Sequence, residues 1–572
     1  MSNGAYAANA ANAANAANAA NAANAANAAN AANAANAANA ANAANATNTI
    51  KTANTFNNVT LAYVVLQVRH VKCDEGKPQC LRCTSTGRKC DGYPTLNKQS
   101  FVGNPTILPG PGLQNPFHCL SGSTDEVRYL EFYFHKVGPK LSGYFDSDFW
   151  LRLVLQLGYA EPAIRHSIMA ISCLYEQGTN NQQLPDGKLH CVNKQGFFLQ
   201  QYNKAINCLV YRMNTQPESF EISLVTCILF IYLEFLRGRS SDEAFCHFRG
   251  GLKILTEFRS RKLKPFSISS TSTDSSALSM VWGSSTVNVL EEKLVPVFAR
   301  LGTVASLFGQ PPLLLPSSEY STTMSPPAAF TDLQGARLLL IDLMNMSLSF
   351  IWLSNSKKYN NDFTLDDMIH HSQLLACLEG WFQAFEVFNE RGSAAHEFED
   401  AANSLRIFHK TAWIWLSSCT DPLELYYDQY LSDFHQLISL AEKIMKVDFP
   451  SRPWQTQLDF SFDMEVVAPL YFAAVRCRDP TTRWKAVNLL AQNPRREGLW
   501  ETERCLVVAK RIIELEEMGF HDRPGSQYPP EQFRIHDAVF ASNSAPGFDV
   551  SFFTLPNGVG TQRHIWQESL QL

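Results

Sequence analysis

Four cysteines stand close together in the first sixth of the chain, within eighteen residues: Cys73, Cys80, Cys83 and Cys90. They are separated by six, two and six residues. Zinc prefers four tetrahedral sulfur or nitrogen ligands, and a pair spaced like Cys80 and Cys83 lets one turn of chain supply two of them. Four cysteines at these intervals, with basic residues between them, indicate descent from a zinc cluster.

The segment from Arg69 to Pro94 reads RHVKCDEGKPQCLRCTSTGRKCDGYP and closely resembles the fungal binuclear Zn2Cys6 DNA-binding domain. In that family two cysteines separated by two residues precede a six-residue gap and the third cysteine. The four cysteines here therefore match its third to sixth ligands. Counting back, the first two ligands should fall at positions 63 and 66, where this chain has Tyr63 and Leu66.

The resemblance implies zinc as the cofactor. In the family, six thiolates hold two zinc ions because the first and fourth cysteines each bridge both metals. Without the first two ligands, one site would keep Cys80, Cys83 and Cys90 and would need a fourth ligand from Cys73, His70 or water. We therefore expect at most one zinc ion on the four cysteines, where the intact family holds two.

The resemblance also implies DNA as the partner. In the family, the helix after the second cysteine enters the major groove and reads a CGG-type triplet, and its basic positions match Arg69, His70 and Lys72. Lysine and arginine can hydrogen-bond guanine O6 and N7. Four more basic residues are candidates for phosphate contacts: Lys77, Arg82, Arg88 and Lys89. The main hypothesis is a zinc-dependent, sequence-specific DNA-binding transcription regulator of RNA polymerase II type, in the nucleus of a fungus.

The missing cysteine pair leaves an alternative open. Structural zinc supplies about 10–16 kcal/mol of apparent binding free energy that is also folding free energy, so we expect half a site to leave the segment disordered or only partly ordered. The alternative is a helical regulatory or interaction protein that has lost DNA binding and pairs with an intact relative. The β-prone stretch VTLAYVVLQV, Val59 to Val68, is unlike the family's lead-in. A wrongly joined first exon and genuine loss of the site both explain it.

Composition and charge agree with a small DNA-binding module on a larger body. The chain has 572 residues, 45% of them hydrophobic, and a net charge of −5. Between Arg69 and Lys98, however, seven basic residues face three acidic ones, which suits contact with a polyanion at one place. The longest nearly uncharged apolar run, Leu224 to Leu236, has thirteen residues, short of the roughly 20 that span a bilayer. We expect no membrane segment and no secretory signal.

Five segments follow from the composition. Residues 1–58 carry an Ala-Ala-Asn repeat without material for a core and are expected to be disordered. Residues 59–94 form the truncated zinc module, and 95–122 form a Pro/Gly/Ser/Asn-rich linker without heptads, which leaves dimer geometry open. Residues 123–522 form a large helical domain, and 523–572 an irregular tail. The ten cysteines from Cys119 to Cys505 are expected to be buried free thiols.

Helical signals accumulate after Ser123, so we predict an all-α fold. Ser123 with Glu126 is a capping-box pattern, and Pro162 suits the first position of a second amphipathic helix. Glu221 to Leu236 is apolar almost all round, which predicts a buried helix. Cys505, Val508, Ile512 and Leu515 share one face of a late helix that Gly519 would end.

The helical part resembles the fungal-specific transcription factor regulatory domain from about Glu126 to Gly519. The segments that carry this resemblance are FYFHKVGPKLSGYFDSDFW, EPAIRHSIMAIS, HFRGGLKIL, VFARLGTVASLFG and RCRDPTTRWKAVNLL. It implies a helical regulatory domain, with a homodimer or heterodimer partner, a coregulator or a small-molecule effector as candidate partners. The sequence has no nucleophile elbow, HExxH, GxxxxGK[ST] or helix-opening GxGxxG, which argues against an enzyme.

Overall fold

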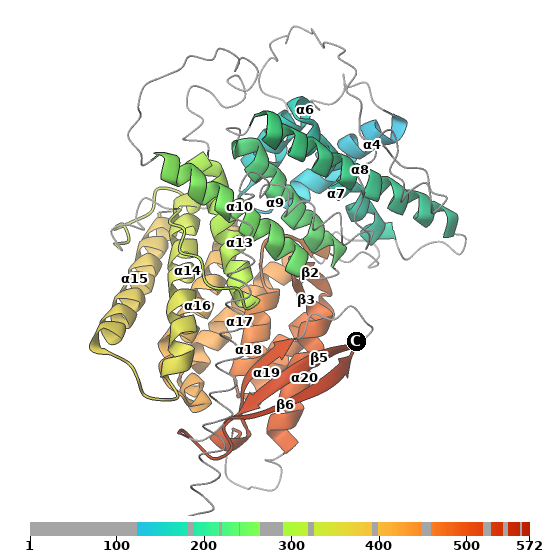
Figure 1. Ribbon diagram of the computed structural model, residues 1–572. Coiled ribbons are helices and arrows are strands. Elements are labelled where there is room, and N and C mark those ends of the chain that lie inside the picture. The colour runs from blue at the N-terminus through green and yellow to red at the C-terminus, as the bar shows by residue number, and fades with distance from the viewer. Residues whose placement is uncertain are drawn as a thin grey trace, which may run out of the picture. The chain divides into compact units, whose positions relative to one another are not determined.

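The computed structural model describes residues 123–180, 188–216, 220–238, 241–262, 290–317, 325–391, 398–447, 459–518, 528–540, 547–560 and 563–572. The Ala-Asn repeat, the cysteine segment and the expected linker lie outside these residues, so their predicted boundaries stay predictions. Within the described ranges helices dominate and strands are few, which confirms the predicted all-α class. Figure 1 shows these helices with a small sheet close to the C-terminus.

The first helices begin where the sequence predicts. Helix α4 (Thr124–Phe132) follows Ser123, and Ser123 and Glu126 form both halves of a capping box. A π-helical turn η2 (Tyr133–Val137), α5 (Gly138–Ser142), a second π turn η3 (Asp148–Leu153) and α6 (Val154–Ala160) come next. Helix α7 (Pro162–Asn180) starts at Pro162, whose fixed φ and missing N–H suit that position. Helix α8 (Lys188–Thr215) packs along α7.

Helix α9 (Phe220–Arg237) is the most deeply buried of the described helices in this part of the chain, as its apolar sequence predicts. Every residue from Ile222 to Phe235 is buried, and α9 packs against α7 and α10 (Ser241–Lys262). A helix apolar on all sides must be covered on all sides, which explains its place between two others.

The middle of the chain forms long helices with clear start signals. After the π turn η4 (Leu290–Leu294) come α13 (Val295–Leu307), α14 (Leu333–Lys357), α15 (Leu365–Glu390) and α16 (Glu399–Ser418). The Asp332 carboxylate caps α14, and Thr364 with Asp367 forms a capping box on α15. Such caps satisfy backbone N–H groups that the helix leaves free.

Helix α14 is long and apolar enough to cross a membrane by length and composition alone. In this protein, however, 67% of its apolar window is buried against other elements, as in the core helix of a globular body. Its apolar residues pack with those of α15 and α16 around Trp381 and Phe385. The apolar character of α14 is therefore accounted for by packing inside the protein.

The later helices surround a second apolar core. A 3-10 turn η6 (Glu424–Tyr430) leads into α17 (Leu431–Val447), followed by α18 (Val467–Arg476), α19 (Pro480–Gln492) and α20 (Thr502–Met518). Cys505, Val508 and Ile512 face this core, as predicted, and Leu515 packs at its edge. Three short strands lie beside these helices: β1 (Asp459–Ser461) is parallel to β2 (Arg495–Glu497), which pairs antiparallel with β3 (Trp500–Glu501).

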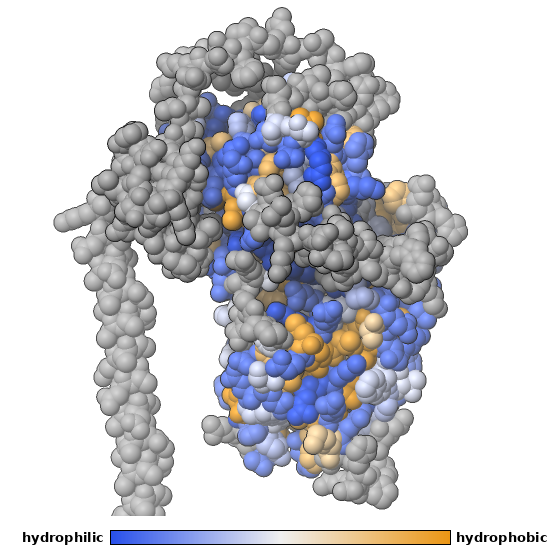
Figure 2. All heavy atoms as spheres, turned by 90° about the vertical axis from the view of Figure 1, so that its right-hand side faces the viewer, coloured by the Kyte–Doolittle hydropathy of each residue, from blue (hydrophilic) through white to orange (hydrophobic). Residues whose placement is uncertain are grey.

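The end of the chain differs from the expected irregular tail. After the turn η7 (Glu531–Phe533), strands β4 (Ile535–Phe540), β5 (Gly547–Thr554) and β6 (His564–Gln571) form an antiparallel sheet in the order β4-β5-β6. Alternate residues of β5, including Phe548, Val550 and Phe552, join the core of α18–α20. The sheet forms because this alternation gives it one apolar face to bury. Figure 2 shows apolar side chains gathered among hydrophilic ones on one face of the molecule.

Candidate functional site

The predicted metal and DNA residues, Cys73 to Cys90 with Arg69, His70 and the neighbouring basic residues, all lie outside the described residues. What the structure does describe is the chemistry of the helical body. Within the described ranges, no group of three or more His, Cys, Asp or Glu side chains is placed to hold a metal ion. Zinc therefore finds no competing site there.

The cysteines of the body are free thiols, as predicted for those that the structure describes. Eight are present: six buried, and Cys208 and Cys246 half-buried. Burial raises the pKa of Cys227 and Cys419 to about 12 and that of Cys477 to about 11. Because a thiol must lose its proton to bind metal or act as a nucleophile, these cysteines are structural.

A large cavity lies where the middle and later helices meet. Its volume is about 610 Å³, within the roughly 300–1,000 Å³ typical of small-molecule sites. The lining comes from the start of α10, the end of α13, residues of α14, α16, α18 and α20, and strands β2, β3 and β4. Segments between Gly238 and Val539 thus meet around one space.

Aromatic rings dominate the cavity wall. They are Phe308, Trp352, Phe408, Trp415, Tyr471, Phe472 and Trp500. Trp500 packs edge-on against Phe308, with ring centres 5.1 Å apart, and lies 5.9 Å from Tyr471. Trp352 on α14 is 53% exposed and Val539 on β4 is 51% exposed, so the lining extends to the protein surface at these residues.

The charged groups of the lining are engaged by other groups of the protein. Glu501 lies 2.9 Å from Nε of Arg504 and 3.6 Å from Nε of Arg496. Arg476 donates to Glu424 behind the wall. Within the described residues, three polar atoms of the lining side chains are buried without a hydrogen-bond partner: the indole N–H of Trp500, the hydroxyl of Ser347 and Nε of Arg504, of which the last is ion-paired with Glu501. Buried polar groups in folded proteins are nearly always paired.

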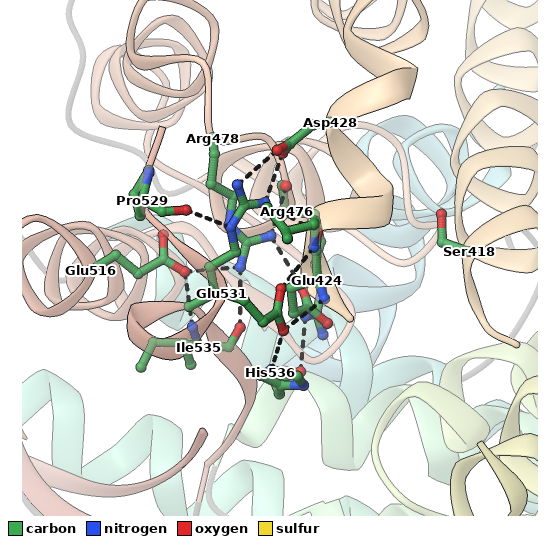
Figure 3. Close-up of polar contacts among 12 residues, drawn as sticks. Ser418, Glu424, Asp428, Arg476, Arg478, Glu516, Pro529, Glu531, Ile535 and His536 are labelled. Carbon is green, nitrogen blue, oxygen red and sulfur yellow. Dashed lines mark hydrogen bonds and ion pairs between the residues drawn. The ribbon is translucent and has the colours of Figure 1, made fainter. Parts of the chain in front are cut away.

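Arg476 links the cavity wall to a buried ionic network, drawn in Figure 3. Glu424 accepts hydrogen bonds from Arg476 at 2.6 Å and from Arg478 at 3.1 Å. Arg478 also donates to Glu516 at 2.8 Å, and Glu516 accepts the backbone N–H of Ile535 at the start of β4. The network therefore ties η6, α18, α20 and the C-terminal sheet together.

The arginines determine the charge state of the network. Burial alone would raise the pKa of Glu424, but Arg476 and Arg478 outweigh it and lower this pKa to about 2. Arg483 donates to the second oxygen of Glu516 at 2.8 Å. Despite complete burial, the pKa of Glu516 is also lowered, by Arg478 and Arg483. Both carboxylates are ionised at neutral pH.

A second buried ionic cluster joins the first helices to the rest of the body. Asp146 accepts from Arg300 at 2.7 Å and from Arg337 at 3.0 Å, and Arg337 also donates to Asp463 at 2.9 Å. Arg300, Arg337 and Asp463 line a smaller cavity of about 80 Å³, which shares Met344, Phe408 and Met464 with the large one. The two cavities thus have part of their lining in common.

A pair of glutamates lies at the start of α18. Glu497 accepts the backbone N–H groups of Glu465, Val466 and Val467, and so caps a helix that has no local cap. Glu465 lies beside it. Burial and the neighbouring Glu497 charge raise the pKa of Glu465 to about 7.

Sequence reasoning did not find the cavity or the ionic network. Arg476, Arg478 and Arg483 stand in a segment already singled out by resemblance, RCRDPTTRWKAVNLL, and that was the one available signal. Their acidic partners, Glu424 and Glu516, are 38 to 54 residues away from Arg478 in the chain. Pairing over such separations leaves no local pattern.

Two models of known protein families match this chain. Residues 128–512 match the family model of the fungal specific transcription factor domain. Residues 67–100 match the fungal Zn(2)-Cys(6) binuclear cluster domain. The first match spans most of the described body, and the second spans the four cysteines.

Individual relatives give the same result. The aspercryptin biosynthesis cluster-specific transcription regulator atnN of Emericella nidulans is 22% identical over 587 residues, covering 82% of this chain and 90% of that protein. The transcription regulator lscL of Purpureocillium lilacinum is 27% identical over 34% of this chain and 48% of its own length. The transcriptional regulatory protein moc3 of Schizosaccharomyces pombe is 65% identical over 31 residues, 5% of this chain and 6% of that protein. No solved structure matches the chain.

Proposed function

Because this chain belongs to the fungal-specific transcription factor family, we propose that it regulates transcription by binding CGG-type DNA through one zinc-loaded half cluster. The chain is a transcription regulator of a fungus and not an enzyme. The observation that carries the proposal is the presence, in one chain, of the cluster match over 67–100 and the regulatory-domain match over 128–512. Its place of action would be the nucleus.

We assign one zinc ion to Cys73, Cys80, Cys83 and Cys90. Support comes from their spacing. Two residues separate Cys80 from Cys83, and six residues separate each of these from a further cysteine, Cys73 or Cys90. Within the described body, the cysteines give further support: burial raises the pKa of most of these thiols, and none belongs to a metal-binding group. Zinc that the full chain binds and that Cys83→Ser removes would therefore report the cluster segment.

Base contacts are proposed for Arg69, His70 and Lys72, and phosphate contacts for Lys77, Arg82, Arg88 and Lys89. The two roles have different consequences. Loss of a base contact relaxes sequence preference by about 1–3 kcal/mol at one position, whereas loss of a phosphate contact weakens binding to all sequences and lowers its salt dependence.

An electrophoretic shift of the full chain on a CGG-containing duplex tests the proposal. We expect a shift that a chelator abolishes and that Cys83→Ser removes. The matched control is Cys246→Ser, because Cys246 is a half-buried free thiol of the body, and this variant should still shift. A shift that ignores both chelator and Cys83→Ser contradicts zinc-dependent binding.

A second candidate function follows from Tyr63 and Leu66, which stand where two ligands are expected. In this account the helical body acts through protein partners and the segment binds no DNA. The double change Tyr63→Cys with Leu66→Cys separates the two. If the natural chain gives no shift and the restored chain gives one, the interaction role is favoured; if both shift, the DNA-binding role stands.

A further inference from the structure

We propose that the 610 Å³ cavity of the helical body is a binding site for an uncharged, largely aromatic small molecule that carries a hydrogen-bond acceptor such as a carbonyl. The cavity is defined by its lining residues, which come mainly from α10, α13, α14, α16, α18, α20 and β2–β4. Only the use of such a ligand to control transcription rests on the proposed function; the binding site itself does not.

The size and shape of the space favour a small molecule. Protein cores are packed as densely as organic crystals, and voids larger than a water molecule are few. Here a space of ligand size borders rings that remain half-buried, among them Phe408, Trp415 and Tyr471. A flat ring system would cover this apolar surface and remove it from water.

Aromatic character follows from the rings that line the wall. Trp500, Phe308 and Tyr471 already contact one another in tilted or edge-on geometry at 5.1 and 5.9 Å. Aromatic pairs prefer such offset and edge-to-face arrangements and gain free energy beyond simple burial. A ligand ring would extend this existing cluster.

The balance of positive and negative side chains in the cavity lining favours a ligand without net charge. Among the described residues that line the cavity are three arginines, Arg476, Arg496 and Arg504, and three acids, Asp242, Glu501 and Asp537. Glu501 pairs with two of the arginines, and Glu424 holds the third. An anionic ligand would therefore lose its hydration without gaining an unpaired arginine as counter-charge, which is costly.

Two hydrogen-bond donors in the described part of the cavity wall lack a partner, which favours a ligand that carries a hydrogen-bond acceptor. Within the described residues, Trp500 Nε1 and Ser347 Oγ have no hydrogen-bond partner. The indole nitrogen can only donate, and the serine hydroxyl can donate as well as accept. Both side chains line the cavity, so a ligand oxygen that reaches either donor would satisfy a group that is otherwise buried unpaired.

Binding would couple distant parts of the body. The lining joins α13 and α14 to α18, α20 and β4, and Arg476 leads from the wall into the Glu424 network. A ligand that contacts both groups of elements would stabilise the arrangement in which they meet. This gives the helical body a means to respond to a small molecule.

Titration of the full-length protein with three fluorescent dyes tests the site. Nile red is uncharged and has a carbonyl. N-phenyl-1-naphthylamine is uncharged and has no oxygen, and 1-anilinonaphthalene-8-sulfonate is its close analogue with a sulfonate. We expect one saturable site per chain for the two uncharged dyes, and binding at least tenfold weaker for the sulfonate. No DNA is present, so a failure of the proposed DNA-binding function leaves this result unaffected.

Two alanine changes locate the site. Ala468 on α18 lines the cavity, and Ala468→Trp should fill it and abolish saturable binding. Ala491 on α19 is exposed and away from the cavity, so Ala491→Trp should bind like the natural protein. If Ala468→Trp does not fold, Ala412→Leu fills less of the same space and should weaken binding at least fivefold.

The acceptor has its own test. Trp500→Phe keeps an aromatic ring but removes the N–H donor together with part of the indole, so both uncharged dyes should lose some packing contact. Nile red should weaken by about fivefold more than N-phenyl-1-naphthylamine, the effect of one typical net hydrogen bond. The proposal is overturned if no dye saturates, if Ala468→Trp binds as well as Ala491→Trp, or if the sulfonate dye binds as tightly as its uncharged analogue.

Discussion

Cysteine occurs in two different settings in two regions of this chain. In the segment from Cys73 to Cys90, four thiols stand at metal-ligand spacing among basic residues. In the described body, eight thiols are scattered over separate helices, and burial raises the pKa of Cys227, Cys419 and Cys477 to between about 11 and 12. The comparison indicates that zinc binding depends on the spacing of the cysteines and on how easily their thiols lose a proton, rather than on the number of cysteines.

The two regions should also differ in what stabilises them. On the proposed function the cluster segment would depend on metal, because zinc binding would supply its folding free energy. The body depends on apolar packing and on buried ionic pairs such as Arg478 with Glu516. A change that perturbs one region should therefore leave the stability of the other region unchanged.

The largest effect should come from removing zinc. A chelator should cost the cluster segment about 10 kcal/mol of binding and folding free energy, and DNA binding with it. The helical content and thermal unfolding of the body, followed by circular dichroism, should stay unchanged. A body that unfolds with the chelator would show that it holds metal itself, against the metal-free chemistry of its described residues.

The next effect should come from the Glu424 network. Glu516→Ala leaves Arg478 and Arg483 buried without their shared carboxylate and removes the acceptor for Ile535 N–H. We expect a loss of about 3–5 kcal/mol in the free energy of unfolding, measured in urea. Zinc content should not change.

Glu514 provides the matched control for Glu516 on the same helix. Its side chain is 62% exposed and pairs with Arg511 at the surface. Glu514→Ala should cost less than about 1 kcal/mol. Equal losses at the two positions would mean that burial of the network contributes nothing.

A smaller effect should come from the second ionic cluster. Asp146→Asn removes the charge that holds Arg300 and Arg337 together, but Asp463 remains beside Arg337. We expect a loss of about 2–3 kcal/mol in urea unfolding. Asp148→Asn, two residues along, removes a 42% exposed carboxylate and should cost under about 1 kcal/mol; similar losses would contradict a buried role for Asp146.

The smallest effect should depend on pH. The pKa of Glu465 is raised to about 7 by burial and by Glu497, so folding favours the protonated form. Its contribution to stability is complete below the unfolded pKa near 4.5 and is lost as the pH rises through 7. The stability advantage of Glu465→Gln over the natural protein should therefore be about 2 kcal/mol larger at pH 7 than at pH 5. A difference that is constant with pH would refute this.

Much of the helical fold could be predicted because its signals are local. The capping box at Ser123, the proline at Pro162 and the apolar run of α9 each lie within a few turns of chain, and the structure confirms all three. The C-terminal sheet was missed although Phe548, Val550 and Phe552 alternate in β5. Such a short pattern is weak until its partner strands are known.

The site could be predicted only in part, for the same reason. The four cysteines form a local pattern within eighteen residues, so the zinc assignment could be made from sequence and stays a prediction. The cavity depends on how helices from Gly238 to Val539 meet. Likewise, the Glu424 network joins residues more than fifty positions apart. Neither has a signature before the chain folds.

The most direct test of the account is the zinc content of the intact chain, measured by native mass spectrometry. We predict one zinc ion per natural chain and per Cys246→Ser chain, none for Cys83→Ser, and two for the chain with Tyr63→Cys and Leu66→Cys. A natural chain without zinc, or a Cys83→Ser chain that keeps it, would contradict the claim that this segment binds metal and DNA for the regulator.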